Sequence, residues 1–436
     1  MSGVPAFIKK ILLPRHSRLG RFLRRLRDDR RDRRFTPPYD PAELLARAEE
    51  FNRNAETYWK AVDSEPSSRA EALRKPFTTI SGTGSLLYRV GLVLEELRPG
   101  IGQVVLDLGA GTCWLSAWLN RLNCRTISMD VSPTALKLGR ELFRQEPQPR
   151  PDLDPQFLGY DGRRLPLPDE SVDRVVCFDA FHHLPNGAEI LGEIFRVLKP
   201  GGRAVFAEPG EGHSRAGHSR IEAERFGVLE NELDLKALAD EARRLGFTEF
   251  LVKPYPDPRA LTLDVREYFE FMNGRDRFFP ADALRRSLRD FQIFSLAKGS
   301  EIVDSRNPSR LLAAISTGPG SAFLQGTPGT VVRVRLNVRN AGDTLWLAES
   351  RPGGGYVSLG GHLLDEKGET LDWDFFRGPL PGPVPANKSI ILEADVRLPE
   401  QSGRYRLRFD LVDENIAWFA QHGSATVDLD VNVSPA

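Results

Sequence analysis

Hydrophobic and polar residues follow two different periods along this chain of 436 residues, and the period changes near residue 317. Between about residues 100 and 210, short apolar runs alternate with longer segments whose apolar residues recur at helical spacing; the runs are QVVLDL, CRTISMD, DRVVCFDA and RAVFAEP. Short apolar strands that alternate with helices are typical of a mostly parallel sheet covered on both faces. The pattern therefore predicts an α/β domain with helices on both sides of one sheet.

Beyond residue 317 the apolar residues alternate with polar ones at every second position. In TVVRVRLNVRN, for example, the valines and the leucine share one face and the arginines share the other, and LEADVRL, YRLRFDL and TVDLDVNV repeat the pattern. Alternation of this kind, broken by turns rich in glycine and proline, indicates half-buried antiparallel strands. We expect an all-β sandwich over residues 320–436. The segment STGPGSAFLQGTPGT is the predicted hinge before it.

The same patterns divide the rest of the chain. We expect the α/β domain to span residues 39–316, with its core at about 75–260 and a helical and loop extension over 261–316. Helices are predicted over 41–63, 85–98 and 112–122 from the spacing of their apolar residues. A further helix is predicted to begin after Ser132, which would cap it, with Pro133 in its first turn.

The first 38 residues form a separate basic arm. Residues 1–34 contain twelve lysines and arginines but only three aspartates, whereas the whole chain has a formal net charge of zero. Leucines and a phenylalanine recur at helical spacing within the arm, which predicts a basic amphipathic helix on an anionic membrane surface. The alternatives are a solvated arm and a helix docked on a protein partner. The acidic remainder of the chain argues against a nucleic-acid partner.

Cysteine content and hydropathy bear on the compartment. The three cysteines form no CxxC pair and no metal-ligand spacing, which suits a reducing compartment. Neither a secretory signal peptide nor an apolar run long enough to cross a membrane is found in the sequence. We therefore expect a cytoplasmic protein whose N-terminal arm places it at the inner membrane face.

The stretch LDLGAGTCW contains a glycine-rich loop at the end of the first predicted strand. A dinucleotide-binding loop would have a third glycine where this chain has Trp114, and Asp107 would oppose a pyrophosphate. An acid in that position suits a cofactor with an ammonium and a sulfonium group and no phosphate, as in S-adenosylmethionine. Asp130, at the end of the second predicted strand, suits the ribose hydroxyls of either kind of cofactor.

Four motifs carry a resemblance to a known family: VVLDLGAGTCW, ISMDVSP, YDGRRLPLPDESVDRVVCFDAFHHL and EIFRVLKPGGRAVFAEP. In order and spacing they resemble the class I S-adenosylmethionine-dependent methyltransferases, in particular those of methyltransferase type 11. The resemblance covers roughly residues 75–260. The resemblance implies a Rossmann-like, seven-stranded sheet and a set of cofactor-binding residues. These are Asp107, Gly109, Ala110 and Gly111 at the methionine moiety, Asp130 and Val131 at the ribose, Asp161 and Gly162 at the adenine, and Phe178 and Asp179 on the cofactor's other side.

Two of these acids also have a purely structural interpretation. Asp107 could be a buried acid that caps the neighbouring loop, and Asp161 could be an ordinary turn residue.

Methyl transfer to a hydroxyl needs alignment and a general base. The candidate catalytic residues are His213, which we prefer as the base, His183 and Glu208. His182 and His183 also have an interpretation as scaffolding of the cofactor pocket, and His218 is a further candidate in the loop that contains His213. The sequence shows no convincing set of metal ligands, so no metal is predicted.

The methyl acceptor is predicted from the sandwich. Three of the six tryptophans lie there, and exposed tryptophan stacks on sugar rings whereas buried tryptophan belongs to a core. The segment resembles the immunoglobulin-like modules of bacterial surface-polysaccharide assembly proteins, which implies a hydroxyl of a saccharide or lipid-linked glycan as acceptor. One alternative is a small-molecule or quinone-type methyltransferase whose sandwich mediates homo-oligomerisation. The other is a non-catalytic glycan-binding scaffold.

Overall fold

A computed structural model describes residues 40–145, 150–253, 262–275, 281–318 and 323–435. The predicted amphipathic helix within residues 1–34 lies outside these ranges. Among the helices that are described, none combines the length and the apolar character needed to cross a membrane.

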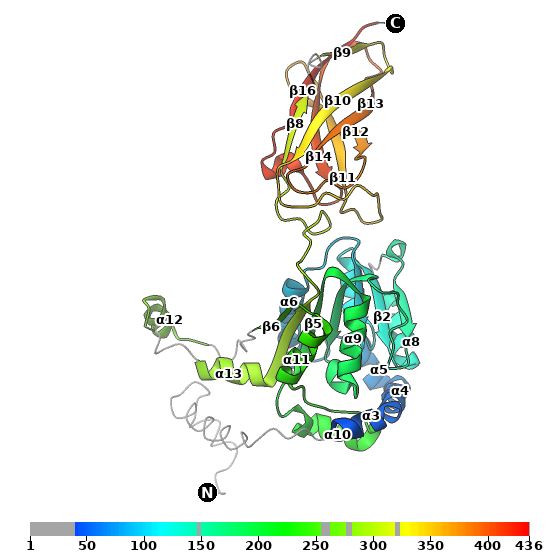
Figure 1. The fold of residues 1–436 in the computed structure, drawn as a ribbon, viewed down its shortest axis with the longest axis vertical. Helices are drawn as coiled ribbons and strands as arrows, with labels where there is room; N and C mark the ends of the chain where they lie inside the picture. The colour runs from blue at the N-terminus through cyan, green and yellow to red at the C-terminus, as the bar shows by residue number, and fades with distance from the viewer. Residues whose placement is uncertain (1–39, 146–149, 254–261, 276–280, 319–322, 436) are drawn as a thin grey trace. The chain divides into compact units, whose positions relative to one another are not determined.

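The α/β domain is built on one seven-stranded sheet in the order β3-β2-β1-β4-β5-β7-β6 (Figure 1). The strands β1 to β5 pair in parallel, and β7 runs antiparallel to both β5 and β6. The strands are β1 (Val104–Leu108), β2 (Arg125–Asp130), β3 (Gln156–Gly159), β4 (Val172–Phe178), β5 (Leu198–Pro209), β6 (Glu249–Lys253) and β7 (Phe291–Ala297). The predicted Rossmann-like, seven-stranded sheet is confirmed.

Both faces of this sheet are buried, as the unbroken apolar runs predicted. Successive residues of a strand point to opposite faces, so Val105 packs into one core and Leu106 into the other. The first core lies under α6 (Ile80–Leu97), α7 (Trp114–Arg121) and α8 (Pro133–Gln145). The second core lies under α9 (Gly187–Val197) and α11 (Leu235–Leu245), which cover the face toward the viewer in Figure 1.

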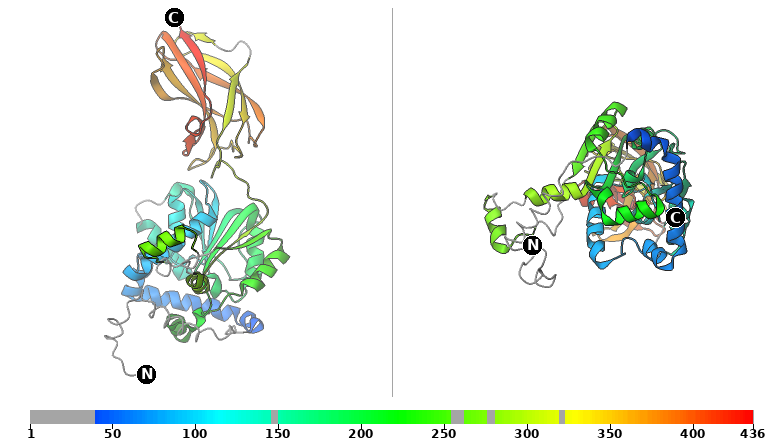
Figure 2. Two further views of the ribbon diagram at one scale, coloured as in Figure 1. Left: turned by 90° about the vertical axis from the view of Figure 1, so that its left-hand side faces the viewer. Right: turned by 90° about the horizontal axis from the view of Figure 1, so that it is seen from below.

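The remaining helices of the domain lie at the ends and edges of the sheet. They are α3 (Pro41–Ala46), α4 (Ala48–Ser64), α5 (Pro66–Leu73), α10 (Gly217–Phe226), α12 (Val265–Met272) and α13 (Ala281–Asp290), with short 3-10 turns η1 (Pro151–Leu153), η2 (Phe181–His183) and η3 (His213–Arg215). Both views place α4 and α10 side by side at one end of the sheet (Figures 1 and 2). Ser132 accepts the backbone N–H of Ala135 at 3.1 Å, so α8 has the predicted cap.

The sheet extends past residue 260, where the sequence patterns placed the end of the core. The strand β7 lies between β5 and β6 and is buried at six of its seven positions. Its sequence FQIFSLA comes directly after α13, and the strand pairs antiparallel with β5 and β6, so it departs from the parallel strand–helix units that precede it.

The C-terminal region consists of two β-sheets packed around one core. One sheet has the order β13-β10-β8 and the other β12-β11-β14-β16-β9. The strands are β8 (Ala313–Thr317), β9 (Phe323–Gly326), β10 (Val331–Asn340), β11 (Val357–Asp365), β12 (Thr370–Pro379), β13 (Ser389–Arg397), β14 (Gly403–Asp413) and β16 (Val427–Val433), with β15 (Ala417–Trp418) and the turn η5 (Phe419–His422) beside β14. Val334, Leu336 and Val338 of β10 are buried while the intervening residues are exposed, so the alternation is confirmed.

The predicted hinge at 316–330 is wrong in part, since both of its ends belong to the sheets. Residues of β8 pair with β10, and β9 pairs in parallel with β16. The strands are short, and the glycines and prolines between them made the segment resemble a linker. The β-sheet region therefore begins at residue 313 rather than at 320.

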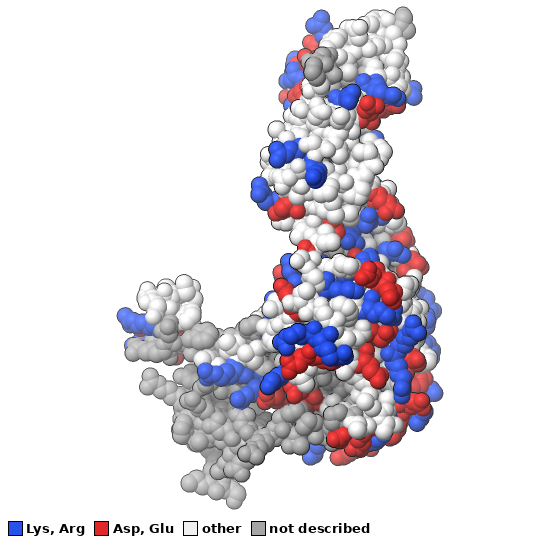
Figure 3. Space-filling view, viewed as in Figure 1, with Lys and Arg blue, Asp and Glu red and all other residues white. Residues whose placement is uncertain are grey.

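Charged residues of both signs are interspersed over the described surface on the face shown in Figure 3, and neither sign forms a continuous band there.

Trp346 is the largest side chain of the sandwich core and is completely buried, with its ring 5.2 Å from that of Phe419. We expect Trp346→Ala to lower the free energy of unfolding by about 3–5 kcal/mol, because the truncation leaves a large cavity. Chemical denaturation of the full chain, followed by circular dichroism, measures the change. Trp373→Ala is the matched control: Trp373 is 54% exposed, and we expect a loss of no more than about 1.5 kcal/mol. Equal losses for both variants would contradict the assignment of Trp346 to the core.

Candidate active site

The glycine-rich loop leaves β1 in a conformation that only glycine adopts easily. Gly109 and Gly111 have φ values of 72° and 52°. A Cβ atom at Gly109 would lie 2.4 Å from the Cβ of Ala180, so the loop passes too close to the segment after β4 for any side chain. The backbone N–H groups of Gly109 and Ala110 donate to the carbonyl of Met129, at 2.8 and 3.0 Å, which ties the loop to β2.

Asp130 closes the other side of this loop. Its Oδ2 accepts the N–H of Gly111 and its Oδ1 accepts the N–H of Ser132, both at 2.9 Å. The side chain is only 7% exposed, and burial raises the pKa of Asp130 to about 6 despite these hydrogen bonds. Each carboxylate oxygen has a second lone pair, so the group can still accept hydroxyl donors from a ligand. Val131, which follows it, is half-buried.

Asp107 makes the contacts of a helix cap. Its Oδ2 accepts both the N–H and the hydroxyl of Ser116, at 3.1 and 2.7 Å, whereas Cys113 at the start of α7 makes no side-chain cap. Burial raises the pKa of Asp107 to about 6. The contacts of Asp107 within the protein are therefore those of a buried capping acid. Its role toward a cofactor stays a prediction.

Asp161 and Gly162 form a turn beside α4. The Oδ1 of Asp161 accepts the N–H groups of Arg163 and Arg164, both at 2.8 Å, and these bonds lower the pKa of the exposed carboxyl. The backbone carbonyl of Asp161 accepts Nδ2 of Asn52 at 3.0 Å. The two predicted site residues of this turn therefore lie next to α4, a helix that precedes them by about 100 residues in the sequence.

Asp179, after β4, has φ of 50° and is paired with Arg89 of α6 through both oxygens, at 2.8 and 2.5 Å. Burial alone would raise the pKa of Asp179, but attraction by Arg89 outweighs it and holds the pKa at about 2. The Arg89 guanidinium lies 4.6 Å from the ring centroid of Phe178, and Trp114 contacts the same ring edge-on. The residue that replaces the third glycine is therefore part of an aromatic wall.

The sequence analysis missed the contribution of α4. A Cβ atom at Gly111 would lie 3.1 Å from the ring of Trp59, so this indole packs directly against the glycine-rich loop. Glu56 accepts the hydroxyls of Ser132 and Thr134 at 2.6 and 2.8 Å, which joins α4 to the start of α8. The apolar face of α4 predicted a helix but gave no sign of which surface it covers, because that depends on long-range packing.

Four of the predicted catalytic or neighbouring residues come together beyond the ends of β4 and β5. Glu208 is fully buried and accepts the N–H groups of Ala180 and Phe181 at 3.2 and 2.9 Å. Its Oε2 lies 2.7 Å from Nδ1 of His182. Glu208 is therefore engaged by His182 and by the backbone that follows β4. The rings of His182 and His183 lie 3.9 Å apart, and the rings of His182 and His213 lie 4.9 Å apart.

Glu230, another residue that the sequence analysis missed, lies among these histidines. Its Oε2 is 2.6 Å from Nε2 of His213 and 3.8 Å from Nε2 of His182. Although burial would raise its pKa, the neighbouring histidines lower the pKa of Glu230. Its place in the sequence, in FGVLENELDL between two helices, shows no spacing relation to any histidine. Only the fold could have identified it.

His183 has a different environment from its neighbour. Its Nδ1 lies 2.6 Å from the carbonyl oxygen of Leu229, so Nδ1 carries the proton and Nε2 is left as an acceptor. Burial and the adjacent His182 lower the pKa of His183 to about 4. The side chain is 35% exposed, which makes it more accessible than His182 or His213.

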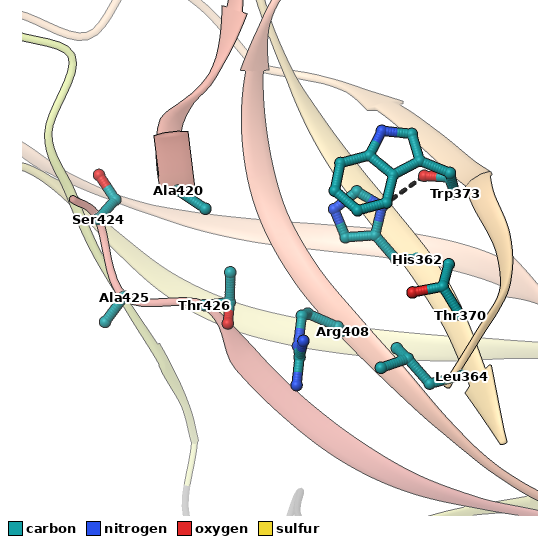
Figure 4. A pocket seen from close by; sticks show the side chains of 9 residues that line it. All are labelled: His362, Leu364, Thr370, Trp373, Arg408, Ala420, Ser424, Ala425 and Thr426. Atoms are coloured by element: carbon teal, nitrogen blue, oxygen red, sulfur yellow. Dashed lines mark hydrogen bonds between the residues drawn. The ribbon is translucent and has the colours of Figure 1, made fainter. Parts of the chain in front are cut away.

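The sandwich contains a pocket of its own, with a volume of about 430 Å³ (Figure 4). Trp373 lies against the imidazole of His362 at its rim, and the carbonyl of Trp373 accepts a hydrogen bond from that ring. The lining is otherwise mixed, with hydroxyls and one guanidinium: Leu364, Thr370, Arg408, Ala420, Ser424, Ala425 and Thr426.

Residues 106–206 match the family model described as a methyltransferase domain. The methyltransferase GfsG of Streptomyces halstedii is 34% identical over 116 residues, which are 26% of this chain and 40% of that protein. A demethylmenaquinone methyltransferase of Streptomyces griseus subsp. griseus is 32% identical over 127 residues, or 29% of this chain and 50% of that protein. The chain thus spans half or less of the length of these two relatives.

Among solved structures, phosphoethanolamine N-methyltransferase 2 of Haemonchus contortus in complex with S-adenosyl-L-methionine is 14% identical. The alignment covers 56% of this chain and 60% of that chain, with a TM-score of 0.40.

We expect binding of S-adenosylmethionine to weaken as the pH falls through about 6. The pKa of Asp130 is raised to about 6, so its carboxylate becomes protonated below that pH. Hydrogen bonds from the ribose hydroxyls favour the charged carboxylate, and the affinity for the cofactor therefore rises with pH. Isothermal titration at pH 5 to 8 measures the profile. Asp130→Asn should weaken binding by about 10-fold to 100-fold at pH 8, as expected for lost hydrogen bonds to a charged group, and should flatten the profile. A wild-type profile retained by Asp130→Asn would contradict this role.

Proposed function

Because the α/β domain is a methyltransferase domain that uses S-adenosylmethionine, we propose that the whole chain transfers its methyl group to a hydroxyl of a saccharide or lipid-linked glycan. The observation that carries the methyl-transfer part is the loop at Gly109 and Gly111, held open by the Asp130 carboxylate. The acceptor part rests on the sandwich pocket and on His183, which lies in η2 after β4.

The residues around the loop suit the proposed cofactor. Two glycines with positive φ leave a cradle without side chains, and Asp130 offers lone pairs to ribose hydroxyls. Asp107 and Asp130 make the surroundings acidic, which suits a sulfonium better than a pyrophosphate. The Lys75 ammonium lies 5.5 Å from the ring of Trp114 and could face the methionine carboxylate. When bound, S-adenosylmethionine supplies an electrophilic methyl group.

His183 is our preferred general base, in place of His213. It is neutral at pH 7 because its pKa is about 4, and the bond to Leu229 leaves Nε2 free to accept the acceptor's hydroxyl proton. His213 lies 2.6 Å from the Glu230 carboxylate, so its Nε2 is already engaged. The Glu208 carboxylate holds the adjoining backbone in place. In this scheme Glu208 and His182 are positioning residues.

The pocket of the sandwich supports a saccharide as acceptor or as anchor. Trp373, which is 54% exposed, lines the pocket together with hydroxyls and Arg408, and aromatic stacking combined with polar donors suits sugar rings. The predicted contact of residues 1–34 with an anionic membrane would hold the enzyme near a lipid-linked acceptor. The cytoplasmic location belongs to the same proposal.

A quinone-type acceptor is the second candidate. It is favoured by the similarity to demethylmenaquinone methyltransferases, which covers about a quarter to a third of this chain. In that case the sandwich would serve self-association rather than sugar binding.

A panel of acceptors separates the two candidates. We expect the full chain to release S-adenosylhomocysteine with soluble oligosaccharides and at most background levels with a reduced naphthoquinone. His183→Ala should then lower turnover by about 100-fold to 10,000-fold on the best acceptor, as loss of a general base does, and leave the affinity for S-adenosylmethionine unchanged. His422→Ala, an exposed histidine of the sandwich, is the control. Turnover on the naphthoquinone alone would overturn the saccharide proposal, and undiminished turnover of His183→Ala would eliminate that base.

Glycan binding by the sandwich is tested separately. We expect the full chain to bind saccharides on a glycan array and Trp373→Ala to lose most of that signal, because the stacking surface at the pocket is removed. Leu371→Ala is the matched control, since Leu371 is an exposed apolar residue of the same strand that does not line the pocket. An equal signal from all three proteins would show that the pocket is not the glycan site.

A further inference from the structure

Two histidines and one glutamate from three separate segments converge beyond the ends of β4 and β5. His182 belongs to η2, His213 to η3, and Glu230 to the loop after α10. One ligand atom from each residue lies within 4.8 Å of the other two. All three side chains are largely buried, with His213 the most exposed at 15%.

We propose that His182, His213 and Glu230 bind one divalent transition-metal ion of the Zn²⁺ class. Two imidazole nitrogens and one carboxylate are a ligand set that suits Zn²⁺ or Fe²⁺, whereas Mg²⁺ and Ca²⁺ prefer oxygen ligands alone. A tetrahedral ion held by three protein ligands keeps one position open, as in catalytic rather than structural zinc sites.

The surroundings of His182 match those of a metal ligand. Histidines that bind metals usually donate their second ring N–H to a carboxylate, which fixes the tautomer and the direction of the ring. Here the Glu208 carboxylate lies 2.7 Å from Nδ1 of His182, which directs Nε2 toward the Glu230 carboxylate, 3.8 Å away. Glu208 is itself held by the backbone N–H groups at residues 180–182, so the ring cannot easily turn away.

The atoms of His213 and Glu230 that would bind the ion lie in direct contact. Nε2 of His213 and Oε2 of Glu230 are 2.6 Å apart, so the two side chains would separate by about 0.7 Å to hold a tetrahedral Zn²⁺ ion between them. The cation would balance the Glu230 charge. The site is close to the surface through His213, and Ser219 lies 3.3 Å from the same nitrogen. The cluster therefore has both a ligand set and a route for the ion to enter.

A role for the ion in methyl transfer rests on the proposed function. His183, whose ring is 3.9 Å from that of His182, would take the proton of an acceptor hydroxyl placed at the open position. The hydroxyl oxygen would attack the methyl carbon as the carbon–sulfur bond breaks, and the electron pair of that bond would remain on sulfur. The ion would polarise the hydroxyl and so favour this proton transfer.

Metal binding is measured on the full chain without a histidine tag, first stripped with a chelator and then titrated with ZnCl₂ against a chromophoric competitor. We expect about one Zn²⁺ per chain, and for His182→Ala and Glu230→Gln an affinity at least about 10-fold lower. His422→Ala and Glu224→Gln, both at exposed positions, are the matched controls and should bind as the wild type does.

Loss of folding is separated from loss of metal binding by two further measurements. First, each variant is checked for binding of S-adenosylmethionine. Second, if a variant fails to fold, Co²⁺ is added to the wild type instead. The visible absorption of bound Co²⁺, and its loss when Zn²⁺ is added, then report on the site. Wild-type Zn²⁺ affinity in both ligand variants, or stripped protein that binds S-adenosylmethionine but neither Zn²⁺ nor Co²⁺, would overturn the metal site. The second result would leave the methyltransferase proposal intact.

Discussion

The buried carboxylate of Glu208 is the constraint on which both sides of the candidate site depend. It is the penultimate residue of β5 and accepts backbone N–H groups from the segment that follows β4, so one carboxyl group supplies the hydrogen bonds that this irregular segment would otherwise lack. That segment brings Ala180 against Gly109 on the cofactor side and aims His182 at Glu230 on the other. A buried carboxylate with several N–H donors is well solvated by the protein, which is why it tolerates complete burial.

The site is composite because its walls come from distant parts of the chain. Helix α4 provides Trp59 against the glycine-rich loop and Asn52 against the turn at Asp161. Helix α6 provides Arg89, whose pairing with Asp179 keeps that carboxylate charged inside the protein. The β-strands present short loops at one edge of the sheet, and the N-terminal helices close over that edge. This arrangement is common in doubly wound folds, where a rigid sheet supports the loops that bind the ligand.

The strands and helices around the glycine-rich loop could be predicted because their apolar periodicity is local. The strand β10 alternates as expected, and α8 begins at its predicted cap. Boundaries were less accurate where short strands lie among glycines and prolines, as at β8 and β9, since turn residues dominate the pattern there. Among the site residues, Glu208 was predicted as a candidate catalytic residue, and its contacts in the structure are those of a positioning group. Glu230 and Trp59 had no signal at all.

The sequence by itself determined that the chain has an α/β domain followed by an all-β region, and that the loop after the first strand suits a cofactor without phosphate. These features follow from residue periods and from the side chains within a few positions of one another. Only the tertiary structure decided that His182, His213 and Glu230 meet, and that Asp107 caps α7. Convergence of this kind depends on how packed helices and crossover connections bring distant residues together, and it leaves no regular spacing in the chain. For that reason no set of metal ligands was predicted from the sequence, whereas the fold assembles one.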